Sequence, residues 1–171
     1  AEDEEGDKSF AYLSETTGRP GRSADFSVIR RWTAPSDAGQ LYLVKEPLTL
    51  GPPVGDGVDI WIVSSRHGLL KHIPVDDRKP AKTRVEKIDI QSGDHIDLVV
   101  SCREHNTFDD FTWAPRLFEV GVTSAGGLYS IKEWRADDAF KRSVLRWEGA
   151  LTPWEQYAQV LMISNEFRFV D

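Results

Sequence analysis

The sequence predicts an all-β protein, an antiparallel, jelly-roll-like β-sandwich with a C-terminal α-helix. Two observations indicate the sandwich. Apolar and polar residues alternate along short runs between residues 26 and 120, which is the period of half-buried strands. Seven or eight such runs follow one another, separated by loops rich in Gly, Pro and Asp, as is typical of sandwiches. The helix is predicted from a separate start signal near the end of the chain.

The strands of the expected sandwich domain, residues 21–121, follow a regular order. The turn-rich stretch GRPGRSAD leads into FSVIRRW, and LYLVKEPLTL comes next, with Pro47 indicating a strand edge or a bulge. The later strands are expected at VDIWIVSS, LLKHIPV, TRVEKIDI, HIDLVVSC and FTWAPRLFEVG. The loops between them contain the residues that favour turns.

Three segments outside the sandwich have a different character. Residues 1–20 begin with AEDEEGDK, so we expect an acidic, partly mobile N-terminal segment. Residues 122–150 mix aromatic residues with many charges without a clean period, and we expect an irregular arm or a short helix there. Residues 151–171 are predicted to form a C-terminal helix and tail. The stretch LTPWE in this segment matches a capping box, in which Thr and Glu side chains bind amides at the helix start.

Charge and cysteine content exclude several classes of protein. The 171-residue chain has a formal net charge of −7 and is 40% hydrophobic, so it can bury a core but has no general attraction for nucleic acid. No apolar run is long enough to span a membrane. Cys102 is the only cysteine, which excludes a disulfide within the chain. We expect Cys102 to be a small buried residue, with a reactive nucleophile as the alternative.

The sequence contains no catalytic signature such as a GxSxG motif, a phosphate loop or a dinucleotide fingerprint. The four histidines lack the spacing of metal ligands. Asp56, Asp109 and Asp110 offer oxygen ligands for a structural calcium ion, but no calcium-loop spacing is present, so solvated loop carboxylates are favoured. We therefore predict a protein that is not an enzyme, with no cofactor and no metal site.

Trp61 is the first candidate for ligand binding. In VDIWIVS, Val58, Ile60 and Ile62 form the inward row, so Trp61 falls on the outward row beside Asp59. Sugar recognition requires a flat aromatic face and nearby polar groups, and this pair provides both. The alternative is that the expected arm covers Trp61. By the same alternation, the outward row of HIDLVVSC is expected to be His95, Asp97 and Ser101.

Two loops provide the other candidate ligand-binding residues. SSRHG contains Arg66 and His67, which can bind hydroxyls, a uronate or a sulfate. The alternative is a turn in which the serines cap backbone groups. CREHNTFDD contains Arg103, His105 and Asn106, and loops at one end of a sandwich are a usual place for binding groups.

Three stretches of the chain resemble a known family: GDGVDIWIVSSRHG, SGDHIDLVVSCREHNTFDDFTWAP and LTPWEQYAQVLMISNEFRFVD. They are similar to the C-terminal region of planctomycete cytochrome-type surface proteins with planctomycete-specific domains, in which a sandwich like a carbohydrate-binding module occurs. The resemblance covers roughly residues 20–120 and 150–171. It implies a periplasmic, cell-surface or secreted module of a larger cytochrome-linked parent. The cytochrome and the large helical domains are not in this sequence, so a shortened relative and an excised fragment both remain open.

We therefore expect a non-catalytic carbohydrate-binding module that holds polysaccharide or oligosaccharide near its parent protein. The alternative is a structural module that docks the helical or redox domains of the parent. Neither hypothesis involves nucleic acid or a membrane span.

Overall fold

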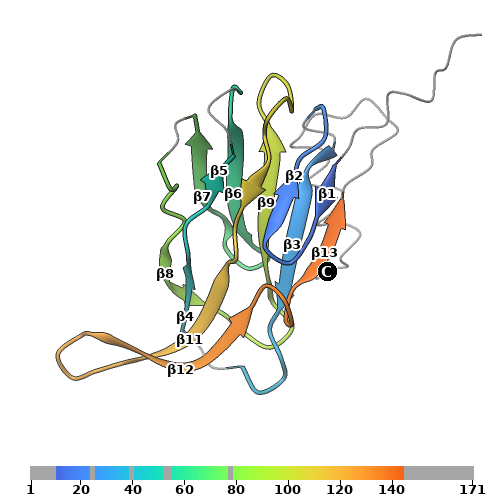
Figure 1. Ribbon diagram of the computed structural model, residues 1–171. Helices are drawn as coiled ribbons and strands as arrows, with labels where there is room; N and C mark the ends of the chain where they lie inside the picture. Colours follow the sequence, from blue (N-terminus) through green and yellow to red (C-terminus); the bar gives the residue numbers. More distant parts are fainter. Residues whose placement is uncertain (1–10, 24–25, 39–40, 52–54, 77–78, 145–171) are drawn as a thin grey trace, which may run out of the picture.

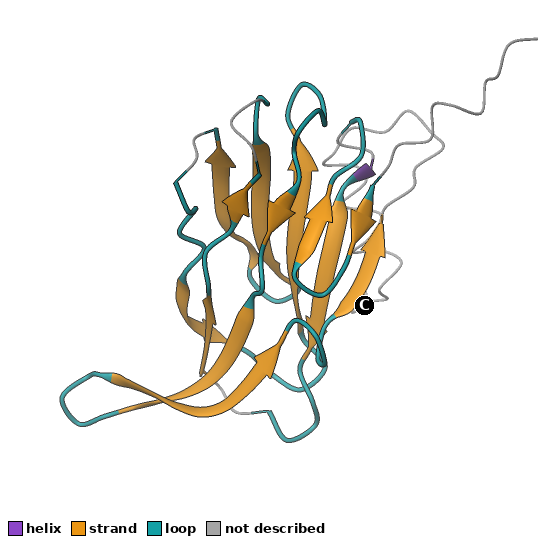
Figure 2. Cartoon of the chain, viewed as in Figure 1, coloured by secondary structure: helices purple, strands orange, loops and turns teal. Residues whose placement is uncertain are grey.

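The computed structural model describes residues 11–23, 26–38, 41–51, 55–76 and 79–144. These residues contain thirteen strands arranged in three sheets, and neighbouring strands are antiparallel throughout. Figure 2 shows that strands dominate the described part of the chain. The prediction of an all-β, antiparallel protein is confirmed for these residues.

The large sheet has the strand order β13-β3-β9-β6-β7 (Figure 1). Its strands are β13 (Lys141–Val144), β3 (Val28–Thr33), β9 (His95–Cys102), β6 (Val58–Ser64) and β7 (Gly68–Val75). The strand β9 lies in the middle, and nearly all of its residues are buried. Because a central strand is flanked on both sides, its row of backbone hydrogen bonds is complete.

Two smaller sheets lie opposite the large sheet. The hairpin sheet consists of β12 (Leu128–Arg135), β11 (Arg116–Val122), β4 (Leu41–Lys45) and β8 (Val85–Asp89), in that order. The small sheet consists of β1 (Tyr12–Leu13), β2 (Thr17–Arg19), β10 (Phe111–Thr112) and β5 (Thr49–Leu50), in that order. The chain passes directly from β4 to β5 and from β10 to β11, so the two sheets form one discontinuous layer.

A single hydrophobic cluster fills the space between the layers. Val58, Ile60 and Ile62 are fully buried in it, as the alternation along β6 predicted. Trp32 of the large sheet contacts two aromatic rings of the hairpin sheet, with centroid distances of 5.1 Å to Tyr42 and 5.2 Å to Trp134. The apolar face of each sheet is thus covered by the other layer, which is the arrangement of a β-sandwich.

The segment at residues 122–150 differs from the expected irregular arm or short helix. Its described part contains β12, which pairs with β11 in a hairpin, and β13, which pairs with β3 at the edge of the large sheet. All residues of β12 are exposed or half-buried, and charged residues occur on both of its faces. The strand therefore lacks a clear alternation of apolar and polar residues. Pairing with a neighbouring strand overrode a weak local pattern.

The two ends of the chain differ in how far the structure describes them. The strands β1 and β2 lie within residues 1–20, so part of the segment expected to be mobile belongs to the small sheet. The predicted C-terminal helix at 151–171 lies outside the described residues. Within the described ranges, no helix combines the length and the apolar character needed to cross a membrane.

Candidate functional site

The outer face of the large sheet carries a cluster of Trp61, His72 and Asp59. Trp61 on β6 is directly paired with His72 on β7, and the two rings stack with centroids 5.0 Å apart and planes 8° apart. The His72 Nε2 atom lies 2.8 Å from Asp59 Oδ1. Trp61 is half-buried and His72 is exposed. The cluster is therefore an aromatic surface with a carboxylate beside it, held on two adjacent strands.

The rest of this face combines apolar and polar residues around one ion pair. Trp61 is paired with Val99, which is paired in turn with Ile29. In the next row, Arg31 donates two hydrogen bonds to Asp97, at 2.8 and 2.7 Å. The ion pair is largely withdrawn from water, since the Asp97 side chain is only 4% exposed.

The expected outward row of β9 is corrected in one respect. Asp97 does lie on the outer face with Trp61, but it is buried there, as are His95 and Ser101. A central strand has neighbours on both sides, so larger side chains on β3 and β6 shield its outward residues from water.

The SSRHG loop does not contribute to this cluster. Arg66 donates to both carboxylate oxygens of Asp94, at 2.6 and 3.2 Å, and His67 Nε2 lies 2.8 Å from the Asp89 carbonyl oxygen. Ser64 Oγ accepts hydrogen bonds from the backbone amides of residues 66 and 67. Arg66 and His67 therefore stabilise the connection between β6 and β7, as the structural alternative for this loop described.

The predicted residues after β9 also have partners within the fold. Arg103 Nη1 donates to the Asp56 carbonyl oxygen at 3.2 Å, and His105 Nδ1 lies 3.1 Å from Asp56 Oδ1. Asn106 Nδ2 donates to the Pro20 carbonyl oxygen at 3.3 Å. These side chains fix the loop against the segment before β6.

The predicted site residues are thus distributed over three places. Pairing of Val58 with Cys102 and of Ser64 with Ile96 puts the two loops at opposite ends of β6, roughly 20 Å apart at about 3.3 Å per residue. Trp61 and Asp59 lie between the two loops, and both contact His72. His72 was not predicted as a site residue, and only the strand register could have identified it as the neighbour of Trp61.

A second polar cluster lies at the end of the sheet where β9 ends. Asp109 is only 1% exposed, which corrects the expectation of a solvated loop carboxylate. Neither of its carboxylate oxygens makes a hydrogen bond of ordinary geometry within the described residues, although the Gly57 backbone amide acts on it as a weak donor that partly offsets the effect of burial on its pKa. Burial, together with the negative charge of Asp56, raises the pKa of Asp109 to about 7.

The carboxylate of Asp56, whose charge acts on Asp109, accepts more hydrogen bonds than the Asp109 carboxylate does. Its Oδ2 atom accepts hydrogen bonds from the amides of Glu104, at 2.5 Å, and His105, at 3.3 Å. Burial raises the pKa of Asp56, but these bonds and the His105 side chain outweigh burial and hold it below its ordinary value. Asp110 points elsewhere and pairs with Arg19. In the described part of the chain, no three His, Cys, Asp or Glu side chains are grouped as metal ligands.

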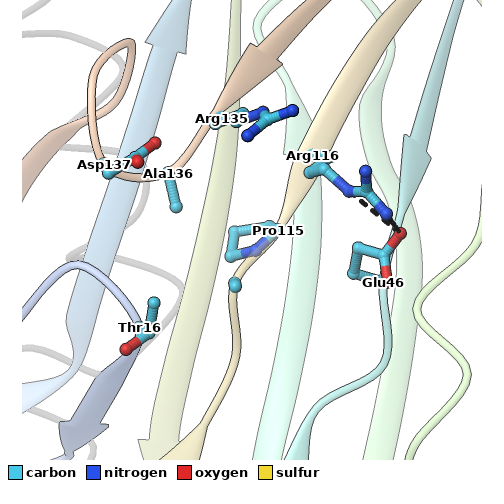
Figure 3. Close-up of a pocket in the computed structure, with 8 residues that line it drawn as sticks. Thr16, Glu46, Pro115, Arg116, Arg135, Ala136 and Asp137 are labelled. Atoms are coloured by element: carbon cyan, nitrogen blue, oxygen red, sulfur yellow. Dashed lines mark hydrogen bonds and ion pairs between the residues drawn. The ribbon is translucent and has the colours of Figure 1, made fainter.

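A pocket of about 370 Å³ opens where β4, β11 and β12 approach the turn after β1 (Figure 3). Arg116 and Glu46 lie at its wall and form an ion pair, with Arg116 Nε 3.0 Å from Glu46 Oε1. Arg116 and Arg135 also contact Glu133, at 3.4 and 2.8 Å. The pocket contains none of the predicted site residues, and its arginines have carboxylate partners.

Comparison of this chain with protein-family models, curated proteins and solved structures finds no match. The geometry and chemistry of the described surfaces are therefore the basis for inferring its function.

Proposed function

We propose that this protein is a non-catalytic carbohydrate-binding module that holds polysaccharide near a larger extracytoplasmic, cytochrome-linked parent protein. The observation that carries the proposal is the stack of Trp61 on His72, with Asp59 bound to the imidazole. Aromatic rings bind the apolar faces of sugar rings, and adjacent carboxylate and imidazole groups bind their hydroxyls.

The cluster is organised before any ligand arrives. Trp61 and Asp59 alternate on one strand, and His72 is the direct cross-strand neighbour of Trp61. The contact with Asp59 restrains the His72 ring, so binding has less side-chain entropy to overcome. One indole face is occupied by His72, which leaves the exposed imidazole and the accessible part of the indole to contact sugar.

The course of the chain supports a jelly-roll topology for this module. The chain passes from β3 in the large sheet to β4 in the hairpin sheet, returns for β6 and β7, and crosses again for β8, β9 and β11. Repeated crossing between layers is typical of jelly rolls. The resemblance to planctomycete surface proteins and the periplasmic, cell-surface or secreted location that it implies remain predictions.

The proposal predicts that Trp61→Ala weakens glycan binding about tenfold or more, because an aromatic side chain that the ligand covers dominates such contacts. Affinity electrophoresis against neutral, uronate-containing and sulfated polysaccharides measures the effect. His72→Ala is expected to act in the same direction, and Trp61→Phe to retain part of the affinity. Circular dichroism confirms that each variant is folded.

Tyr129→Ala is the matched control, since it removes an exposed aromatic side chain from the hairpin sheet. It should leave glycan affinity unchanged. Failure of the folded protein to be retarded by any polysaccharide, or equal retardation of wild type and Trp61→Ala, would contradict the proposal.

The β11–β12 hairpin favours a second candidate, a module that docks helical or redox domains of the parent. The hairpin projects from the sandwich (Figure 1), and Val122, Tyr129 and Ile131 on it are 46%, 53% and 56% exposed. In the described part of the chain β12 pairs with β11 alone, so its other edge is available to a partner. In this case Tyr129→Ala would reduce capture of the parent's helical domains, while Trp61→Ala would not.

A further inference from the structure

The loops before β6 and after β9 enclose a group of oxygen atoms around Gly55. A β-carbon built on Gly55 would lie 2.9 Å from the Thr107 carbonyl oxygen, 3.1 Å from Asp109 Oδ1 and 3.6 Å from the Phe108 carbonyl oxygen. The absence of a side chain at Gly55 therefore lets one carboxylate oxygen and two backbone carbonyl oxygens pack closely against this residue.

The backbone conformation of the second loop brings these oxygen atoms toward Gly55. Phe108 has a φ of 65°, a left-handed conformation that is uncommon for a bulky residue. The Asp109 amide donates to the Asn106 carbonyl oxygen at 3.4 Å, and the Asp110 carbonyl oxygen accepts from the Gly51 amide at 2.7 Å. These bonds hold the loop on both sides of the Asp109 side chain.

The Asp109 carboxylate requires a partner that the nearby cations do not supply. Arg19, whose charge acts on Asp109, donates to Asp110 instead, and His105 lies against Asp56. Asp56 Oδ1 is also buried, and the His105 Nδ1 atom lies 3.1 Å from it at the loop surface. Burying a carboxylate without a hydrogen bond or a counter-charge is costly, and a second carboxylate nearby increases the cost.

We propose that Asp109, Asp56 and the carbonyl oxygens of Thr107 and Phe108 bind a calcium ion between the two loops. Calcium is the divalent cation of choice for this set, since it accepts carboxylate and carbonyl oxygens in flexible geometry and completes its shell with water. Two carboxylates balance its charge, and Gly55, which has no side chain, lets the oxygen atoms of the second loop approach the first loop closely. The ion would join the start of β6 to the loop after β9, at the end of the large sheet away from the SSRHG turn.

The test is thermal unfolding of the full chain after treatment with a chelator, followed by titration with calcium chloride. We expect the melting temperature to rise by about 5 to 10 °C at a hundredfold excess over the dissociation constant. Calorimetry should give one calcium ion per chain. Sodium chloride at equal ionic strength should give no comparable shift, and magnesium should give a smaller one because it requires stricter octahedral geometry.

Asp109→Asn should fold and lose the calcium-dependent shift. Gly55→Ala is a second variant, since its β-carbon would push the Thr107 carbonyl oxygen and Asp109 Oδ1 away while both carboxylates remain. Asp76→Asn is the matched control, because this nearby carboxylate is 71% exposed and should leave the shift intact.

A wild-type melting temperature that does not respond to calcium would overturn the proposal. So would an Asp109→Asn variant with the full calcium response. Stabilisation of the wild type by lower pH alone, without any cation effect, would mean that Asp109 carries a proton in place of the ion. Glycan binding is a separate measurement, so failure here leaves the proposal for Trp61 standing.

Discussion

At the scale of single residues, the fold treats two neighbouring arginines of β3 in different ways. Arg31 points to the outer face and forms a two-bond ion pair with Asp97. Arg30 points inward and is 1% exposed, and its Nη2 atom donates to the Ser14 carbonyl oxygen at 3.0 Å. Burial, with the charge of Arg142, lowers the pKa of Arg30 to about 10. The charge of Arg31 is therefore neutralised by Asp97. The Arg30 guanidinium instead holds the turn between β1 and β2 through its hydrogen bond to the Ser14 carbonyl oxygen.

We predict that Asp97→Ala lowers the free energy of unfolding by about 2 to 4 kcal/mol, because it leaves Arg31 without its carboxylate in a largely buried position. Urea denaturation measures the change. Glu86→Ala is the control, since Glu86 pairs with Arg84 at an exposed site and its loss should cost less than about 1 kcal/mol. Equal effects of the two substitutions would mean that solvent screens the Asp97 pair as well.

At the scale of elements, the entry into β6 depends on a glycine that no other residue can replace. Gly57 has a φ of 91°, and a β-carbon there would lie 1.9 Å from the Val75 carbonyl oxygen. The residue thus allows the backbone before β6 to approach the end of β7 closely. Gly93, in the turn before β9, has a similar φ of 85° but open space around it.

This contrast separates backbone conformation from steric contact. We predict that Gly93→Ala costs about 1 to 2 kcal/mol, the penalty of a left-handed conformation alone. Gly57→Ala should cost at least about 3 kcal/mol, since the loop must also move away from β7. Thermal and urea unfolding of both variants give the comparison. A Gly57→Ala variant no less stable than Gly93→Ala would show that the loop adjusts freely.

At the scale of the whole molecule, aromatic side chains join the two layers. Trp32 from the large sheet lies between Tyr42 and Trp134 of the hairpin sheet, and the last two rings are 5.7 Å apart. Trp32 and Tyr42 are fully buried. The hairpin that projects into solvent is therefore attached at its base to the common core.

We predict that Trp134→Ala lowers the free energy of unfolding by about 2 to 4 kcal/mol while unfolding remains a single transition, because the layers share one core. Ile131→Ala on the same strand should change it by less than about 0.5 kcal/mol, since Ile131 is exposed. Tryptophan fluorescence and circular dichroism should give coincident unfolding curves. Two separate transitions would indicate that the hairpin sheet unfolds independently.

The short-range pattern in the sequence was sufficient for the class of the fold and for much of its core. The alternation in VDIWIVS correctly separated Val58, Ile60 and Ile62 from Trp61, because successive side chains of a strand point to opposite faces whatever its partners are. The same rule failed to show that Asp97 is buried, since shielding of an outward residue depends on the neighbouring strands. It also missed β12, whose exposed side chains carry little periodic signal.

For the candidate sites, local sequence and strand pairing determined different features. Local sequence was enough to place Trp61 beside Asp59 and to nominate the polar loops. The strand register then brought His72 against Trp61, sent the SSRHG and CREHN loops to opposite ends of β6, and enclosed Asp109 near Asp56. Side-chain direction is a local property of the backbone, whereas proximity and burial arise from pairing between segments that are distant in the chain, and no short stretch of residues encodes them.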